Sequence, residues 1–200
     1  MFCARFFVTL QQVSDKAERE VTDPTPRWGG VSDLTKKQKD KKMKNEGKKS
    51  YRILFVCHGN ICRSPMAEFV MKDLARKAGL DDRLVIESAA TSTEEIGNSV
   101  YPPARRKLAE HGISCQGKTA RQMTRQDHER FDLLVGMDQW NMRNMNRICG
   151  GDPRGKIVML MDYTSRPGEV ADPWYTGDFE ATWRDVLEGC EGLLAWLAFD

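Results

Sequence analysis

The strongest constraint on the fold is residues 53–74, where an apolar run, a short loop and a helical pattern follow one another without a break. The run Ile53–Val56 predicts a buried strand, and residues 66–74 have the spacing of a helix. A loop that leads from a strand into a helix N-terminus points consecutive backbone N–H groups inward, which forms a nest the size of an anion. Cys57 and Arg63 stand at the two ends of this loop. A nucleophile, an N–H nest and a bidentate cation together suit attack on a phosphate monoester.

Each residue type in the loop, CHGNICRSP over 57–65, has a physical task in such a nest. Because a helix N-terminus and a nearby guanidinium both stabilise a thiolate, we expect Cys57 to be ionised at neutral pH. Arg63 matches two phosphoryl oxygens with its planar fork. Gly59 permits close approach of an anion or a positive φ, and Asn60 can adopt a left-handed conformation and brace the loop. Ser64 is expected to cap the following helix and to donate a hydrogen bond to the sulfur.

The same residues have a plainer interpretation, in which a buried cysteine ends a core strand and an ordinary capped helix follows. A cysteine and an arginine at this spacing occur often by chance. The functional interpretation is favoured by a combination of features: a strand, a Gly-Asn turn, a Ser-Pro helix start and a suitable acid downstream.

The rest of residues 50–200 alternates between strand and helix patterns. Strands are predicted over Arg52–Val56, Leu84–Glu87, Phe131–Gly136 and Lys156–Met161, and helices over Ser64–Ala78, Pro102–His111, Gln139–Ile148 and Asp178–Leu197. Strands separated by helices indicate a parallel sheet with right-handed crossovers. We therefore expect an α/β three-layer sandwich with a four-stranded parallel sheet and the phosphate-binding loop after its first strand. Ligands of such sheets bind beyond the carboxyl ends of the strands, which is where Cys57 stands.

Several segments share one family pattern: CHGNICRSPMAE over 57–68, SAATS over 88–92, EIGN over 95–98, ARQ over 120–122, the FD and MD pairs at 131–132 and 137–138, and DPWY over 172–175. Over about residues 50–198 the chain resembles the low-molecular-weight protein tyrosine phosphatases. The resemblance implies hydrolysis of phosphotyrosine through a phosphocysteine formed on Cys57. No cofactor and no metal are expected, because the nest and Arg63 already supply the charge stabilisation.

The leaving phenolate needs a proton, which a carboxylic acid within hydrogen-bond reach supplies. Asp172 precedes Pro173, which biases it to an extended conformation, and the segment predicts an exposed loop before the last helix. Asp-Pro is a common turn starter, so the pair alone carries little weight. The resemblance assigns Asp172 as general acid, and then as the base that activates water.

The resemblance also places the walls of the substrate cleft. Trp174 and Tyr175 are either partly buried loop aromatics or, as the resemblance favours, rings that hold the substrate's ring. Glu94 matches a variable second wall where many relatives carry an aromatic residue. An acid at this position favours basic residues beside the phosphotyrosine and repels acidic ones. His58, Ile61 and Cys62 complete the phosphate-binding loop.

Three further residues are expected to support the loop. Ser88 matches a position that hydrogen-bonds to Asn60. Asp138 is expected to orient the loop, although it could equally cap the helix that starts at Gln139. Lys118 replaces a bridging histidine of the family's network, so the bracing must differ here.

The chain has six cysteines, and their spacing shows no paired short motif of the kind that holds structural zinc. Relatives with the Cys57 and Cys62 pair can form a reversible disulfide that protects the nucleophile from over-oxidation. We expect the same latch here, the alternative being that Cys62 is only a small packing residue.

Three alternative functions share this loop. Arsenate reductases that resemble it need two more cysteines close together, whereas Cys115 and Cys149 are far apart in the sequence. Arginine phosphatases of the same fold place threonine where Ile61 stands. A non-catalytic phosphate-binding or redox-sensing module would lack the nucleophile, the arginine or the acid, and all three are present.

Residues 1–49 lack sustained periodicity and contain a basic run over 36–44, which predicts a disordered basic extension ahead of a domain over 50–200. Met43 is an alternative start. Residues 2–10 are too short and interrupted for a membrane span or a convincing signal peptide. Because the mild positive charge lies in the extension, nucleic-acid binding is not expected. We expect a cytoplasmic monomer or weak dimer without membrane contact, a phosphotyrosine protein as substrate and a tyrosine kinase as one candidate partner.

Overall fold

The computed structural model describes residues 50–199, so the extension predicted over 1–49 lies outside the described residues. The sheet contains the strands β1 (Tyr51–Cys57), β2 (Leu84–Ala90), β3 (Leu133–Gly136) and β4 (Ile157–Met159). All neighbours pair in parallel, in the order β2-β1-β3-β4. The predicted four-stranded parallel sheet is confirmed.

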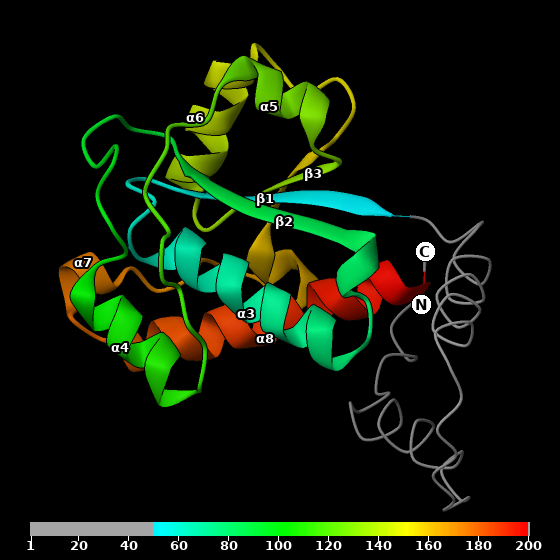
Figure 1. Cartoon of the computed structure of the whole chain (residues 1–200). Helices are drawn as coiled ribbons and strands as arrows, with labels where there is room; N and C mark the ends of the chain where they lie inside the picture. Colours follow the sequence, from blue (N-terminus) through cyan, green and yellow to red (C-terminus); the bar gives the residue numbers. More distant parts are fainter. Residues whose placement is uncertain (1–49, 200) are drawn as a thin grey trace, which may run out of the picture. The chain divides into compact units, whose positions relative to one another are not determined.

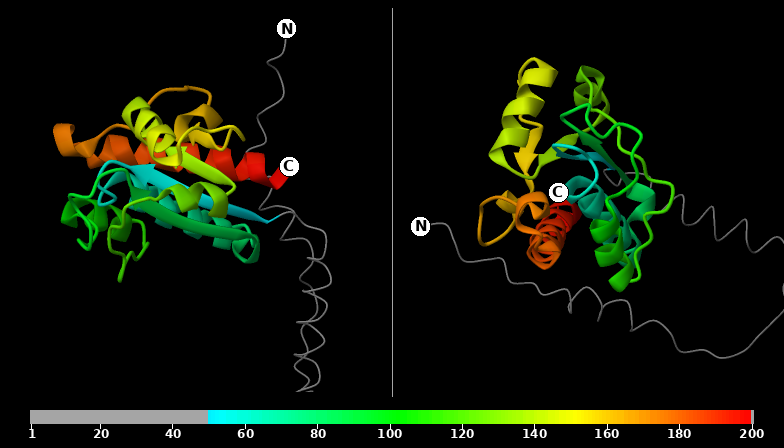
Figure 2. Two further views of the ribbon diagram at one scale, coloured as in Figure 1. Left: turned by 90° about the horizontal axis from the view of Figure 1, so that it is seen from above. Right: turned by 90° about the vertical axis from the view of Figure 1, so that its left-hand side faces the viewer.

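Helices cover both faces of this sheet (Figure 1; Figure 2, right). The helices are α3 (Arg63–Lys77), α4 (Pro102–Glu110), α5 (Arg125–Arg130), α6 (Gln139–Cys149), α7 (Pro173–Thr176) and α8 (Phe179–Phe199), with short 3-10 turns at η2 (Asp81–Arg83) and η3 (Leu160–Tyr163). Helices α3 and α8 lie on one face, with α4 packed beside them, and α5 and α6 lie on the other. The expected three-layer α/β arrangement is therefore confirmed. Within residues 50–199, no helix is long and apolar enough to cross a bilayer.

Strand β1 is buried between these two helix layers. Ile53 and Phe55 point into the core under α3 and α8, whereas Leu54 and Val56 point into the core under α5 and α6. All four side chains are completely buried. A strand buried on both faces needs a continuous apolar run instead of an alternating one, which is why β1 was recognisable in the sequence.

The position of β1 also creates the site. Cys57 ends β1 at the same edge of the sheet as Ala90 at the end of β2 and Gly136 near the end of β3. From this edge the chain after β1 enters α3 on one face, and the chain after β3 enters α6 on the other. The two connections diverge beyond the strand ends, which is the place where open α/β sheets bind their ligands.

The fourth strand is shorter than predicted, because the chain leaves the sheet after Met159 and forms η3 over Leu160–Tyr163. The reason lies in α8, which presents two glycines to η3. A Cβ atom on Gly192 would lie 2.0 Å from the Tyr163 carbonyl oxygen, and one on Gly189 would lie 2.5 Å from Leu160 Cγ. Such close packing holds η3 against the helix and ends the strand.

Two short helices differ from the prediction. Helix α5 has a wholly polar sequence, RQDHER, without apolar periodicity. Its sequence signal is the capping box of Thr124 and Asp127, whose side chains each bond the other residue's backbone. Phe131 is the residue that ends α5, so the chain joins the sheet two residues later. Strand β3 therefore starts at Leu133 instead of Phe131. Helix α7 occupies the segment predicted as an exposed loop.

Candidate active site

The loop from Cys57 to Arg63 has its carbonyl groups turned outward. The carbonyl oxygens of Cys57, His58 and Ile61 accept hydrogen bonds from the N–H groups of Thr91 (2.9 Å), Ser92 (3.0 Å) and Tyr101 (2.9 Å). In a planar trans peptide the following N–H group points the opposite way. The peptides after these carbonyls therefore aim their N–H groups at the centre of the loop, as an anion nest requires.

The Cys57 sulfur lies at the floor of this nest, only 3% exposed. The Asn60 N–H donates to the sulfur at 3.3 Å, and the Ser64 hydroxyl lies 3.1 Å from it. The Asn60 side-chain amide donates to the same hydroxyl at 2.8 Å, and the Ala89 carbonyl lies 3.4 Å from it as a further acceptor. The sulfur is thus held between a backbone N–H group and a hydroxyl group.

One expectation about the loop was wrong and another was confirmed. Helix α3 begins at Arg63 with Cys62 as its N-cap residue, so the Ser64 hydroxyl serves the sulfur and does not cap the helix. Asn60 adopts the left-handed conformation, with φ +58°, while Gly59 does not. A Cβ atom on Gly59 would lie 3.1 Å from Glu95 Cγ, so a side chain at this position would have to displace the Glu95 side chain.

The Asn60 side chain connects the loop to its surroundings. Its amide nitrogen donates to Ser88 Oγ at 2.8 Å, which is the contact expected for Ser88. Its amide oxygen accepts the Arg121 N–H at 3.2 Å. The left-handed turn is thus tied to β2 and to the segment that pairs with the end of β2.

A buried acid that the sequence did not reveal lies behind Ser88. Glu68 on α3 accepts the Ser88 hydroxyl at 2.6 Å and pairs with Lys118 at 2.8 Å. Lys118 also donates to the Ser88 carbonyl at 3.1 Å. Burial alone would raise the pKa of Glu68, but the Lys118 charge and the Lys72 and Ser88 hydrogen bonds outweigh it and hold that pKa below its usual value. Lys118 is therefore an ion-pairing brace of the loop.

Arg63 is buried between two carboxylates. Its Nη1 lies 2.6 Å from Asp138 Oδ2 and its Nη2 lies 2.6 Å from Asp172 Oδ2, with only 5% of the arginine side chain exposed. Burial would lower the pKa of Arg63, but the charges on Cys57, Asp172 and Asp138 hold it above its usual value. Asp138 fulfils both of its expected tasks, because its other oxygen accepts the Asn141 N–H and caps α6.

Asp172 reaches Arg63 from the segment that leads into α7. It also caps α7 by accepting the Trp174 N–H at 3.1 Å. Helix α8 anchors the residue before it, because Ala171 donates to Asp185 (3.0 Å) and accepts from the Thr182 hydroxyl (2.9 Å). Helix α8 therefore holds the candidate acid beside the nest through the residue that precedes it.

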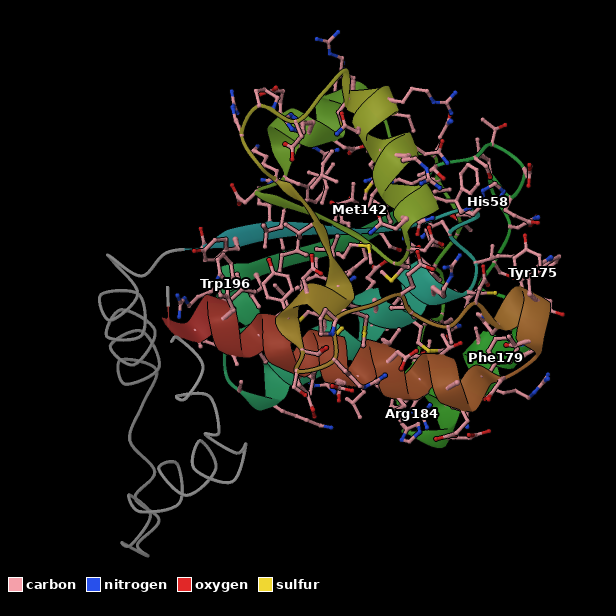
Figure 3. All side chains as sticks on the ribbon, turned by 180° about the vertical axis from the view of Figure 1, so that it is seen from behind. His58, Met142, Tyr175, Phe179, Arg184 and Trp196 are labelled. Carbon is pink, nitrogen blue, oxygen red and sulfur yellow. The ribbon has the colours of Figure 1, made fainter. Side chains whose placement is uncertain are left out.

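The two aromatic residues after Asp172 are exposed, Trp174 by 60% and Tyr175 by 85%. The Trp174 ring packs at 5.7 Å on Tyr101, which the sequence analysis did not identify. In Figure 3, Tyr175 and His58 lie at the same end of the described domain. Tyr175 is almost fully exposed, whereas Trp174 is partly covered by Tyr101.

Glu94, in the loop after β2, pairs with His58 at 3.0 Å. Both side chains are largely exposed, His58 by 57% and Glu94 by 70%. Two side chains of the loop itself, Ile61 and Cys62, are buried and form a small cluster with Ala120. Burial, then the charges on Cys57 and Asp172, raise the pKa of Cys62 to about 12.

The Lys118–Glu68 pair predicts a specific loss of stability. Lys118→Met leaves a buried carboxylate without its main partner and should cost about 3 kcal/mol of unfolding free energy. Lys72→Met removes the half-exposed partner of the same carboxylate and should cost less than about 1 kcal/mol. Urea denaturation of the two variants measures this difference, and equal losses would contradict the role given to Lys118.

With this geometry in place, the chain can be compared with known proteins. The family model for low molecular weight phosphotyrosine protein phosphatase matches residues 52–200. YfkJ, a low molecular weight protein-tyrosine-phosphatase of Bacillus subtilis, is 41% identical over 145 residues, which are 72% of this chain and 93% of YfkJ. The low molecular weight phosphotyrosine protein phosphatase of Rattus norvegicus is 39% identical over 157 residues, which are 76% of this chain and 98% of the rat protein.

Solved structures agree with these sequence matches. The crystal structure of YfkJ matches with a TM-score of 0.72 at 38% identity and covers 75% of this chain and 96% of YfkJ. The crystal structure of DARP, a Drosophila arginine phosphatase, matches with a TM-score of 0.66 at 30% identity and covers 72% of this chain and 95% of DARP. Because the family model matches residues 52–200 and the matches cover more than nine-tenths of these two relatives, the chain belongs to the low molecular weight phosphotyrosine protein phosphatase family.

Proposed function

We propose that this protein hydrolyses phosphotyrosine in proteins, with Cys57 as nucleophile, Arg63 as phosphate clamp and Asp172 as general acid and base. The observation that carries the proposal is the convergence of four groups at one point. The sulfur, the inward N–H groups and the Arg63 guanidinium surround one anion-sized space, and Asp172 lies 2.6 Å from that guanidinium. The family membership supports the same reaction.

In the first step the Cys57 thiolate attacks phosphorus, a P–S bond forms and the P–O bond to tyrosine breaks. Arg63 and the loop N–H groups bind the three equatorial oxygens, whose charge they stabilise in a site largely closed to water. Asp172 transfers its proton to the departing phenolate oxygen.

In the second step water attacks the phosphocysteine. The Asp172 carboxylate takes a proton from this water, the P–O bond forms and the P–S bond breaks. Inorganic phosphate leaves and the thiolate is restored, so that Cys57 and Asp172 return to their starting states.

The contacts of Arg63 give substrate binding a specific order. Asp138 holds one end of the guanidinium, whereas Asp172 occupies the other end, which the phosphoryl group needs. An incoming phosphate dianion replaces Asp172 on Arg63 and leaves its carboxyl group beside the leaving oxygen. The ion pair between Arg63 and Asp138 keeps the guanidinium oriented during this exchange.

The walls of the cleft support an aryl phosphate. The exposed rings of Trp174 and Tyr175 offer a flat apolar surface to a phenyl ring. Arsenate reduction is less favoured, because Cys115 and Cys149 are buried in separate core clusters on opposite faces of the sheet and cannot act together. Arginine phosphatase activity is the second candidate function, since DARP shares the fold.

A phosphoprotein substrate follows from the same argument, and a tyrosine kinase that acts on that substrate is the partner we propose. We also propose a cytoplasmic location. All cysteines among the described residues are free and buried, which suits a reducing compartment.

Cys57→Ser tests the reaction itself. Because serine keeps the N–H nest and Arg63 but lacks the thiolate, the variant should lose turnover and still bind inorganic phosphate. Turnover of phosphotyrosine, phosphoarginine and arsenate should be compared in parallel for the wild type, with EDTA present. Undiminished phosphotyrosine turnover in Cys57→Ser, or a wild-type preference for phosphoarginine, contradicts the proposal.

Asp172→Ala tests the acid. Rates with aryl phosphates of poor leaving groups should fall roughly 10²–10⁴-fold and rates with good leaving groups much less. Inorganic phosphate should bind more tightly, because no carboxylate competes for Arg63. Asp172→Asn separates charge from hydrogen bonding, and equal slowing across leaving groups argues against acid catalysis.

We propose that Cys62 protects the nucleophile from oxidation. Peroxide converts the Cys57 thiolate to a sulfenic acid, the Cys62 sulfur attacks it, water leaves and a disulfide forms. After peroxide treatment, wild-type activity should return on addition of a thiol, whereas Cys62→Ser should stay inactive. The latch is disproved when both proteins recover equally.

We propose that Glu94 selects substrates with basic neighbours. A lysine or arginine beside the phosphotyrosine would take the place of His58 as the partner of Glu94. Two peptides that differ only in flanking arginine or glutamate should differ in kcat/KM by about threefold to tenfold in the wild type. Glu94→Gln should reduce this ratio, and Glu129→Gln, on the distant α5, should keep it. An unchanged ratio in Glu94→Gln rules out this selectivity.

A further inference from the structure

Within residues 50–199, a pocket of about 500 Å³ is lined by residues of α4 and of the segments on either side of it, and none of the residues of the phosphate-binding loop lines it. We call it the α4 pocket. Its walls include the apolar side chains of Val100 and Ile113, and its lining also includes Arg105, Cys115 and Lys118. Its volume falls within the range of small-molecule sites, and its lining joins apolar side chains to cationic ones.

Arg105 gives the α4 pocket an available positive charge. Among the described residues, no carboxylate lies within 4.0 Å of its guanidinium, in contrast to Lys107 on the same helix, which pairs with two glutamates. Burial raises the pKa of Cys115, and the Arg105 charge opposes this rise. The guanidinium is therefore close enough to the pocket lining to act on it.

Lys118 connects the α4 pocket to the active site. It lines the pocket, and its ammonium group pairs with Glu68 and donates to the Ser88 carbonyl. Glu68 in turn holds Ser88, and Ser88 accepts the Asn60 side chain of the phosphate-binding loop. A ligand that shifts the Lys118 side chain thus acts on the brace of the nest through three direct contacts.

We propose that the α4 pocket binds a small organic anion with an apolar body, of the aryl sulfonate or aryl carboxylate class, and that its occupancy changes anion affinity at the phosphate-binding loop. The apolar part would lie against Val100 and Ile113, and the anionic group would pair with Arg105. The coupling rests on the proposed function of the loop, whereas binding in the pocket does not.

The binding is tested with 1-anilinonaphthalene-8-sulfonate, whose fluorescence reports an apolar environment, while saturating orthovanadate occupies the active site. The wild type should bind the probe saturably. Arg105→Glu should weaken binding about fivefold to tenfold, because attraction becomes repulsion. Arg106→Glu is the matched control, since this exposed neighbour on α4 does not line the pocket, and it should bind like the wild type. Absence of saturable binding, or equal binding by the two variants, overturns the proposal.

The coupling is tested by measuring orthovanadate affinity with and without the probe. Linkage requires that the probe changes orthovanadate affinity by the same factor as orthovanadate changes probe affinity. Equal orthovanadate affinities under the two conditions overturn the coupling. If the proposed hydrolysis is wrong, turnover is absent while the probe still binds. If the coupling is wrong, turnover is present and the probe leaves orthovanadate affinity unchanged, so the two failures are distinguishable.

Discussion

The left-handed turn at Asn60 is the constraint on which the site depends. Asn60 is the one described non-glycine residue with a positive φ, a conformation that costs about 1–2 kcal/mol for most residues. Its side chain offsets this cost with bonds to Ser64, Ser88 and the Arg121 backbone. Through this one turn the chain reverses, so that the sulfur at the end of β1 and the guanidinium at the start of α3 face the same space.

The mouth of the site combines two walls of different chemistry on a common floor. One wall is aromatic and belongs to α7, which α8 anchors, and the other carries Glu94 and belongs to the loop after β2. The floor consists of backbone groups whose positions depend on the sheet. The loop after β2 holds the Cys57 and His58 carbonyls through the backbone N–H groups of Thr91 and Ser92, so the side chain at Glu94 can change without a change in these contacts.

The sheet and the nest could be predicted from the sequence because their signals are local. Strand β1 is a continuous apolar run, and the residues that form the nest occupy one short stretch of sequence, Cys57 to Ser64, although several of their hydrogen-bond partners lie elsewhere in the chain. Asp172 was identified only through the family resemblance, since its contact with Arg63 joins distant parts of the chain. Glu68 was missed for the same reason: on α3 it resembles any helical glutamate, and only the packing of Lys118 and Ser88 against it reveals a buried brace.

The differences in the fold have equally specific causes. The end of β4 is determined by glycines of α8, far along the sequence, and α5 lacks the apolar periodicity that marks the longer helices. A local pattern cannot report a contact with a distant helix. The capping box of Thr124 is the exception, a local signal that would have revealed α5.

The contact between η3 and α8 has a consequence for the chemistry. Tyr163 rests on Gly192, and the chain from there to Asp172 is fastened again to α8 at Asp185 and Thr182. Helix α8 thus fixes the position of Asp172, the proton donor that we propose. A side chain added at Gly192 would push η3 off the helix while Asp185 and Thr182 still held the chain before Asp172, so a substitution outside the site would strain the segment that carries this acid.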